Sequence, residues 1–138
     1  MPLSHDDRCA ITDLINLHGH LCDSGELDRF GEVFTDDVVY DVSDLGGGEL
    51  HGLDALAAAG LALGEGNPVG HHVTNIILAE RADGLVHARS KGLGVRADGT
   101  TGSLTYEDTV VRGERGWRIS HRKLIVHRVP LNGVWRTP

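Results

Sequence analysis

The second half of the chain alternates four β-rich runs with short turns, and this pattern constrains the fold more than any other feature. The runs cover residues 70–80, 85–96, 101–112 and 116–129. The segments between them are Ala82-Asp83-Gly84, Ala97-Asp98-Gly99 and Gly113-Glu114-Arg115-Gly116. Asp-Gly between β-rich runs is typical of a tight hairpin. The pattern therefore predicts a four-stranded antiparallel meander.

The first half predicts helices with one strand between them. Ser4 followed three residues later by Asp7 is typical of a helix start, and a helical stripe of apolar residues continues to residue 22. Shorter helices are expected over 26–33 and 53–63, with a strand at 38–42. Residues 44–52 are expected to form a loop and the tail 130–138 to be extended. Helices followed by a meander predict an α+β domain whose helices cover one face of a bent sheet around a cavity.

Length and composition exclude several classes of protein. A chain of 138 residues fits one domain, expected over residues 1–138. The 13 Lys and Arg against 20 Asp and Glu give a formal net charge of −7, which argues against a nucleic-acid partner because phosphate binding needs a basic face. No apolar run approaches the roughly 20 residues of a membrane helix, so no membrane association is expected. The N-terminus lacks the pattern of a signal peptide, which predicts a cytoplasmic protein.

The sequence offers no metal or nucleotide motif. Cys9 and Cys22 would lie roughly 20 Å apart on one helix, too far for a disulfide. No zinc spacing, P-loop or dinucleotide fingerprint is present, so no metal and no cofactor are expected.

Two adjacent histidines stand out among the nine. His71 and His72 open a predicted strand, and because neighbouring strand residues face opposite ways, one of them points toward the helices. Asp23 ends the first helix. A carboxylate that accepts one ring N–H of a histidine leaves the other nitrogen free as a base. The residues alone leave two interpretations open: a catalytic His-Asp pair, or a capped helix end beside an ordinary core histidine.

A set of segments in fixed order adds to this interpretation. The segments are DRCAITDL (7–14), DSGELD (23–28), FTDD (34–37), HGLDAL (51–56), HHVTN (71–75), YED (106–108) and GWRISHR (116–122). With them the chain resembles, over residues 6 to about 128, the SnoaL-like group of the nuclear transport factor 2-like superfamily. That group includes scytalone dehydratase, hexachlorocyclohexane dehydrochlorinase and polyketide cyclases.

The resemblance implies a fold and a catalytic pair. The fold is α+β and cone-shaped, with N-terminal helices on the concave face of a curved antiparallel sheet, and it commonly forms a homodimer or homotrimer. In dehydratase-type members, an Asp after the first helix pairs with a His on the strand after the third helix. These positions match Asp23 and His71, and the family pattern favours His71 over His72 as the catalytic histidine.

The resemblance also implies a function. We expect a cofactor-independent lyase or isomerase, of dehydratase or cyclase type, that moves a proton on a small apolar molecule in an enclosed pocket. The expected substrate-binding residues are His18, Tyr40, His72, Asn75 and Tyr106. Asp108 and Arg112 are expected to form a structural ion pair with Arg122.

Other functions stay open on the same fold. They are a non-catalytic module that binds a small ligand and the small subunit of an aromatic-ring-hydroxylating dioxygenase. An epoxide hydrolase would need an Asp-Arg-Asp set, which the sequence does not place.

Overall fold

The computed structural model describes residues 2–136. The chain begins with helix α1 (His5–Asp23), the 3-10 helix η1 (Leu27–Glu32) and strand β1 (Phe34–Asp41). It continues with η2 (Ser43–Leu45), β2 (Glu49–His51), α2 (Leu53–Leu63) and η3 (Gly64–Gly66). The second half is β3 (Gly70–Glu80), β4 (Val86–Val95), β5 (Thr101–Gly113), β6 (Gly116–His127) and η4 (Pro130–Arg136). The element order confirms helices followed by a four-stranded meander.

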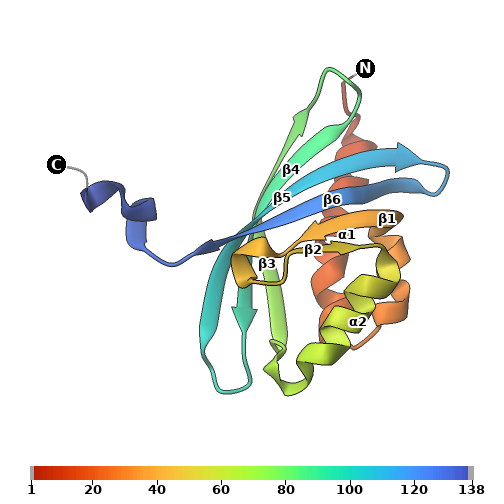
Figure 1. Ribbon diagram of the computed structural model, residues 1–138. Coiled ribbons are helices and arrows are strands. Elements are labelled where there is room, and N and C mark those ends of the chain that lie inside the picture. The colour runs from red at the N-terminus through yellow and green to blue at the C-terminus, as the bar shows by residue number, and fades with distance from the viewer. Residues whose placement is uncertain (1, 137–138) are drawn as a thin grey trace.

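The six strands form one curved sheet in the order β2-β1-β6-β5-β4-β3, which does not close into a barrel. Strands β3 to β6 pair antiparallel, as predicted. The two helices lie on one side of the sheet (Figure 1). The predicted α+β class with a curved sheet is thus confirmed. One detail was wrong: β1 pairs with β6 in parallel, so the sheet is mixed rather than purely antiparallel.

The Asp7 carboxylate both caps the start of helix α1 and bonds it to the β5–β6 hairpin. The Ser4 hydroxyl accepts the Asp7 N–H at 3.0 Å, and the Asp7 carboxylate accepts the Ser4 N–H at 3.3 Å, which completes a capping box. Asp7 Oδ1 also accepts from Trp117 Nε1 at 3.1 Å and from Arg112 Nη2 at 2.9 Å. These bonds hold the start of α1 against the β5–β6 hairpin. Arg112 was expected to join the Arg122 ion pair, but it lies near the helix start and pairs with Asp7 instead.

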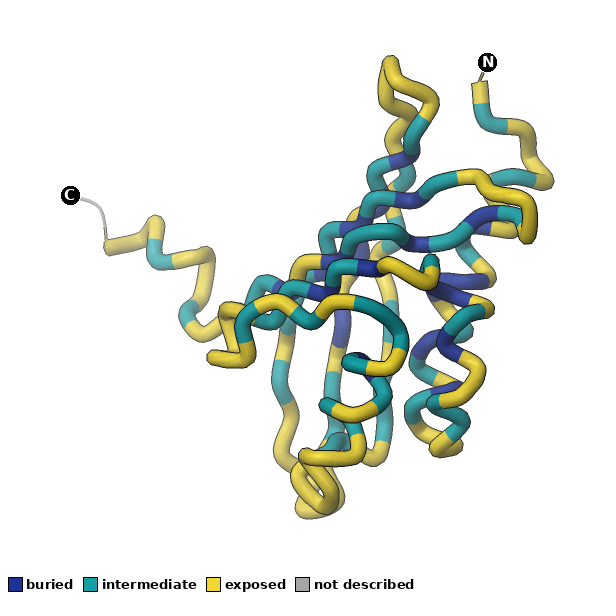
Figure 2. The backbone as a smooth tube through the Cα atoms, turned by 45° about the vertical axis from the view of Figure 1, so that its right-hand side comes forward, coloured by how far each residue is buried: buried dark blue, intermediate teal, exposed yellow. Residues whose placement is uncertain are grey.

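The core fills the space between α1 and the concave face of the sheet. Buried residues alternate along β4 and β5, as expected for strands with one covered face. Helix α1 contacts β3 and β6, and its buried residues are Ile11, Leu14, Ile15, His18 and Leu21. In Figure 2 the buried positions follow α1 and the middle of the strands, whereas the hairpin tips and the C-terminal segment are exposed. No helix among residues 2–136 combines the length and apolar character that crossing a membrane would take.

Three segments differ from the sequence prediction. Strand β1 starts at Phe34 rather than at 38, and the expected loop 44–52 contains β2. Strand β2 forms because its residues extend the sheet beside β1, a contact that local sequence does not encode. The tail was expected to be extended, but Pro130–Arg136 folds into helical turns through left-handed Leu131, Asn132 and Gly133. Residues 137–138 of that prediction lie outside the described residues.

Candidate functional site

Asp23 and His71 lie in direct contact. Asp23 is the last residue of α1 and His71 the second residue of β3. His71 Nδ1 lies 2.6 Å from Asp23 Oδ1, and the His71 main-chain N–H donates to both carboxylate oxygens at 3.0 and 3.1 Å. The carboxylate therefore fixes both the strand and the ring. Since an ionised carboxylate only accepts, Nδ1 carries the proton and neutral His71 has Nε2 free as a base.

The close approach of β3 to α1 depends on a residue without a side chain. A Cβ atom on Gly19 would lie 2.5 Å from the His71 carbonyl oxygen, closer than real atoms approach. Gly19 is one turn of helix before Asp23, so the bare backbone at this turn leaves room for the strand that carries His71. The sequence analysis missed Gly19, because a glycine inside a helix gives no local sign of what crosses it.

His72 and Asn75 do not contact the Asp23–His71 pair. Both are exposed, and His72 points to the opposite side of β3 from His71. Asn75 has a left-handed backbone (φ 57°) where the β3–β4 pairing shifts between Thr74 and Ile77. The alternation of strand residues thus separates the two histidines, and the bulge removes Asn75 from the row of inward-facing positions.

Deeper in the molecule, Arg122 joins a carboxylate to a histidine. Its Nε and Nη2 donate to Asp108 at 2.7 and 2.8 Å, and both side chains are fully buried. The predicted Asp108–Arg122 pair is therefore present. The Arg122 Nη1 donates to His18 Nδ1 at 3.1 Å. The guanidinium thus bonds one carboxylate and one imidazole, which is not the Asp-Arg-Asp set of an epoxide hydrolase.

The contact with Arg122 determines the tautomer of His18. A guanidinium only donates, so His18 Nδ1 must accept, and the proton of the neutral ring lies on Nε2. That nitrogen lies 3.4 Å from Cys22 Sγ. Burial and the nearby Arg122 charge hold the pKa of His18 well below its ordinary value, and the pKa of the Cys22 thiol is raised to about 11 because it is buried. His18 is therefore a neutral donor whose other nitrogen is occupied.

Aromatic rings surround the buried guanidinium. The Arg122 carbon Cζ lies 4.1 Å from the centre of the Tyr106 ring, 5.6 Å from that of Phe34 and 6.0 Å from that of Tyr40. Burial raises the pKa of both tyrosines, so their hydroxyls stay protonated. Gly92 makes room for Tyr106, since a Cβ there would lie 2.6 Å from the ring. Tyr40, Tyr106 and His18 thus all lie beside Arg122, and their expected role in substrate binding stays a prediction.

The site has two parts, one near the protein surface and one deeper inside. The Asp23–His71 pair is partly exposed, with 31% and 23% of the two side chains accessible. The His18 ring lies behind it, 6.5 Å from the His71 ring between centres. Within residues 2–136, no three His, Cys, Asp or Glu side chains gather as a metal site would require. The arrangement offers one accessible base with protonated polar groups behind it.

Two surface hollows lie elsewhere. The larger, about 630 Å³, lies between α1 and the β5–β6 hairpin, and the smaller, about 290 Å³, lies beside the same hairpin near Thr35. Neither is lined by Asp23 or His71. An enclosed apolar pocket at the Asp23–His71 pair therefore stays a prediction.

Comparison with known proteins places this site in context. A family model described as a SnoaL-like domain matches residues 4–123. No curated protein matches the chain. Among solved structures, an NTF2-like protein with a cystatin-like fold from Novosphingobium aromaticivorans is 27% identical, with a TM-score of 0.74, covering 91% of this chain and 85% of its own.

Two further structures share the fold at lower identity. The LinA structure is 24% identical with a TM-score of 0.74, covering 95% of this chain and 93% of its own. A scytalone dehydratase-like protein of Novosphingobium aromaticivorans is 21% identical with a TM-score of 0.70, covering 91% of this chain and 89% of its own. At these identities the likeness shows the fold.

Proposed function

This chain belongs to the SnoaL-like family, and from that premise we propose that it is a cofactor-independent lyase or isomerase. Its substrate would be a small apolar molecule carrying a carbonyl, hydroxyl or halide. The observation that carries the proposal is the 2.6 Å contact between His71 Nδ1 and Asp23 Oδ1. This contact leaves His71 Nε2 as the base.

The proposed step is a proton transfer from carbon. His71 Nε2 takes a proton from a substrate C–H bond, and the electron pair of that bond forms a double bond as a β-hydroxyl or halide leaves. In a dehydration the imidazolium returns the proton to the hydroxyl, which leaves as water. In an isomerisation the proton returns to another carbon. Asp23 stabilises the imidazolium and keeps Nε2 pointed away from itself.

The buried groups support a single-base mechanism. His18 cannot compete for the proton, because its Nδ1 already accepts from Arg122. Burial keeps the Tyr40 and Tyr106 hydroxyls protonated. Such groups stabilise negative charge that develops on a substrate oxygen without taking a proton from carbon. One structural neighbour is named for scytalone dehydratase, and the proposed step is compatible with a dehydration.

Proton abstraction can be measured before the substrate is known. The protein is incubated in D₂O with a panel of small cyclic ketones and β-hydroxy ketones, and deuterium entering the carbon next to the carbonyl is followed by mass spectrometry. His71→Ala should lower exchange about 10²–10⁴-fold, the usual contribution of a general base. His72→Ala is the matched control, because the neighbouring ring is exposed on the other side of the strand.

The outcomes separate the candidate functions. Exchange that survives in His71→Ala contradicts the assignment of the base. A non-catalytic binding module is favoured by one observation, namely that both hollows lie away from Asp23 and His71. Such a module would bind panel members without exchange and would keep its affinity in Asp23→Asn. A dioxygenase subunit would instead copurify with a larger iron-containing chain.

A further inference from the structure

The row of the sheet that carries His71 has no side chain on the next two strands. His71 of β3 pairs with Gly94 of β4, and Gly94 pairs with Gly102 of β5. Paired residues of adjacent strands share one face of a sheet, so both glycines face the side on which His71 meets α1. In Figure 1 this row lies at the lower end of the sheet, where β3 and β5 begin and β4 ends. The backbone beside the base is therefore bare.

Two glycines of β4 on this inner face are covered by other residues. A Cβ atom on Gly92 would lie 2.6 Å from the Tyr106 ring and 2.8 Å from Leu104. A Cβ atom on Gly94 would lie 3.3 Å from the Pro68 ring. At both positions the missing side chain thus makes room for the protein's own apolar groups.

Gly102 is open and lies beside a cation. Among residues 2–136, and apart from its own chain neighbours, only Arg96 Nη2 comes within 4 Å of a Cβ atom built on Gly102, at 4.0 Å. Arg96 follows the end of β4, and its guanidinium therefore reaches over the inner face of β5. A glycine inside a strand weakens the strand and often marks a place where a ligand approaches the backbone closely.

Arg96 is held in place without an acidic partner. Its Nη1 donates to the Thr100 hydroxyl at 3.4 Å. The Asp98 carboxylate of the same turn accepts from the Thr100 N–H at 2.9 Å and from the Thr100 hydroxyl at 2.7 Å. Within the described residues Arg96 forms no ion pair, so the Nη2 end of its guanidinium stays available beside Gly102.

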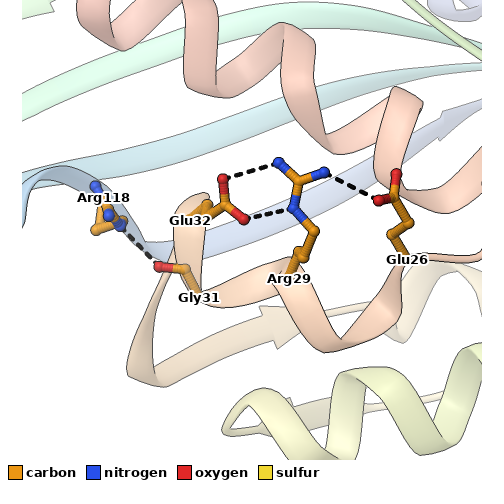
Figure 3. Close-up of polar contacts among 5 residues, drawn as sticks. All are labelled: Glu26, Arg29, Gly31, Glu32 and Arg118. Atoms are coloured by element: carbon orange, nitrogen blue, oxygen red, sulfur yellow. Dashed lines mark hydrogen bonds and ion pairs between the residues drawn. The ribbon is translucent and has the colours of Figure 1, made fainter.

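Other arginines have already spent their donors. Figure 3 shows two of them: Arg29 bonds both carboxylate oxygens of Glu32 at 2.6 and 3.0 Å, and Arg118 Nε donates to the Gly31 carbonyl at 2.8 Å. A guanidinium that keeps its donors binds a carboxylate through two parallel N–H bonds. Arg96 therefore has the chemistry to bind a carboxylate on a ligand.

The base and this cation lie over different strands. His71 belongs to β3, whereas the Arg96 guanidinium reaches over Gly102 of β5, and two strand spacings amount to about 10 Å. Pro68 and Leu104 give the inner face between them an apolar character. One ring with a substituent spans such a distance, so a single ligand can meet both groups.

We propose that Arg96 and Gly102 select the substrate of this site. An apolar ring lies over Gly102, a carboxylate on the ring binds Arg96, and the carbon that loses its proton lies at His71 Nε2. Arg96 binds only and takes no part in the proton transfer. The inference rests on the proposed function for the role of His71, and it narrows the substrate class to cyclic carbonyl compounds that carry a carboxylate.

The test compares two ketones with the same ring, 4-oxocyclohexanecarboxylate and 4-methylcyclohexanone. Their dissociation constants from the full chain are measured by NMR titration, and deuterium exchange beside the carbonyl by mass spectrometry. The wild type should bind the carboxylate about tenfold more tightly or better, as for a hydrogen bond to a charged group. Arg96→Gln should abolish this preference. Arg89→Gln should keep it and is the matched control, because Arg89 lies on the opposite face of β4.

Gly102→Val tests the place of the ring. Valine suits a strand better than glycine and meets only the Arg96 nitrogen at 4.0 Å, so the variant should unfold at the same or a higher temperature. Both ketones should nevertheless bind about tenfold more weakly, because the side chain occupies the position of the ring. Gly113→Val is the matched control: it lies at the other end of β5, its nearest atom is also 4.0 Å away, and it should bind both ketones like the wild type.

The outcomes separate this inference from the proposed function. Equal or absent binding of the two ketones by the wild type overturns the inference, as does a preference that survives in Arg96→Gln or unchanged binding by Gly102→Val. Exchange on the neutral ketone that depends on His71 would still support the proposed function. An Arg96-dependent preference without such exchange would keep Arg96 and Gly102 as binding residues and contradict the role of His71.

Discussion

At the residue scale, the fold controls the protonation of His18. Burial and the Arg122 guanidinium, which donates to Nδ1 at 3.1 Å, hold the pKa of this histidine well below its ordinary value of 6.5. The folded protein therefore keeps His18 neutral at pH values where the unfolded chain protonates it. Stability from this residue is complete above about pH 6.5 and falls as the pH drops, because the unfolded state then binds the extra proton.

This linkage predicts a difference between His18→Gln and the wild type. Glutamine has no proton to bind, so the variant loses that part of the pH dependence. Between pH 7 and pH 5, the unfolding free energy of the wild type should fall by up to about 2 kcal/mol more than that of His18→Gln. Urea unfolding at the two pH values measures both. Parallel pH profiles would show that His18 titrates in the folded protein as it does in the unfolded chain.

At the scale of elements, the crossing of α1 and β3 creates the Asp23–His71 contact. Neither element forms it alone: the helix ends on the carboxylate, the strand begins with the imidazole, and the bare backbone at Gly19 lets them meet. A methyl group at this position forces the strand outward by several tenths of an ångström or more. The ring would then lose its bond to Asp23, although alanine favours a helix over glycine.

Gly19→Ala and Gly60→Ala separate these two effects. Both replace a helical glycine, but a Cβ on Gly60 would meet its neighbour, Leu27, at an ordinary 3.5 Å. Gly60→Ala should be neutral or stabilising by up to about 1 kcal/mol. Gly19→Ala should remove the low-field NMR signal of the His71 Nδ1 proton that bonds to Asp23. If that signal persists unchanged in Gly19→Ala, the glycine does not position the histidine.

At the scale of the whole molecule, charge is unevenly distributed. The 20 acidic residues all precede residue 128, whereas residues 128–136 carry Arg128 and Arg136 and no acidic residue. The helical turns that this segment forms leave Leu131, Val134 and Trp135 exposed.

The features that could be predicted from the sequence depend on residues close together in the chain. The capping pair Ser4 and Asp7 and the Asp-Gly turns at 83–84 and 98–99 act within a few residues, so helix α1 and the meander follow from them. The alternation of a strand separates His71 from His72, and the family pattern pointed to His71. The α+β class and a His-Asp pair were therefore within reach of sequence reasoning.

The tertiary structure decided what depends on contacts between distant residues. The parallel pairing of β1 with β6, the bond from Arg122 to His18 and the partnering of Arg112 with Asp7 join positions about 80 to 105 residues apart. No local preference encodes which of several arginines reaches a given carboxylate, because the backbone path sets their distances. The same reason applies to the C-terminal segment: the sequence shows a short apolar tail, and only the fold places it beyond the end of β6 as helical turns with exposed apolar side chains.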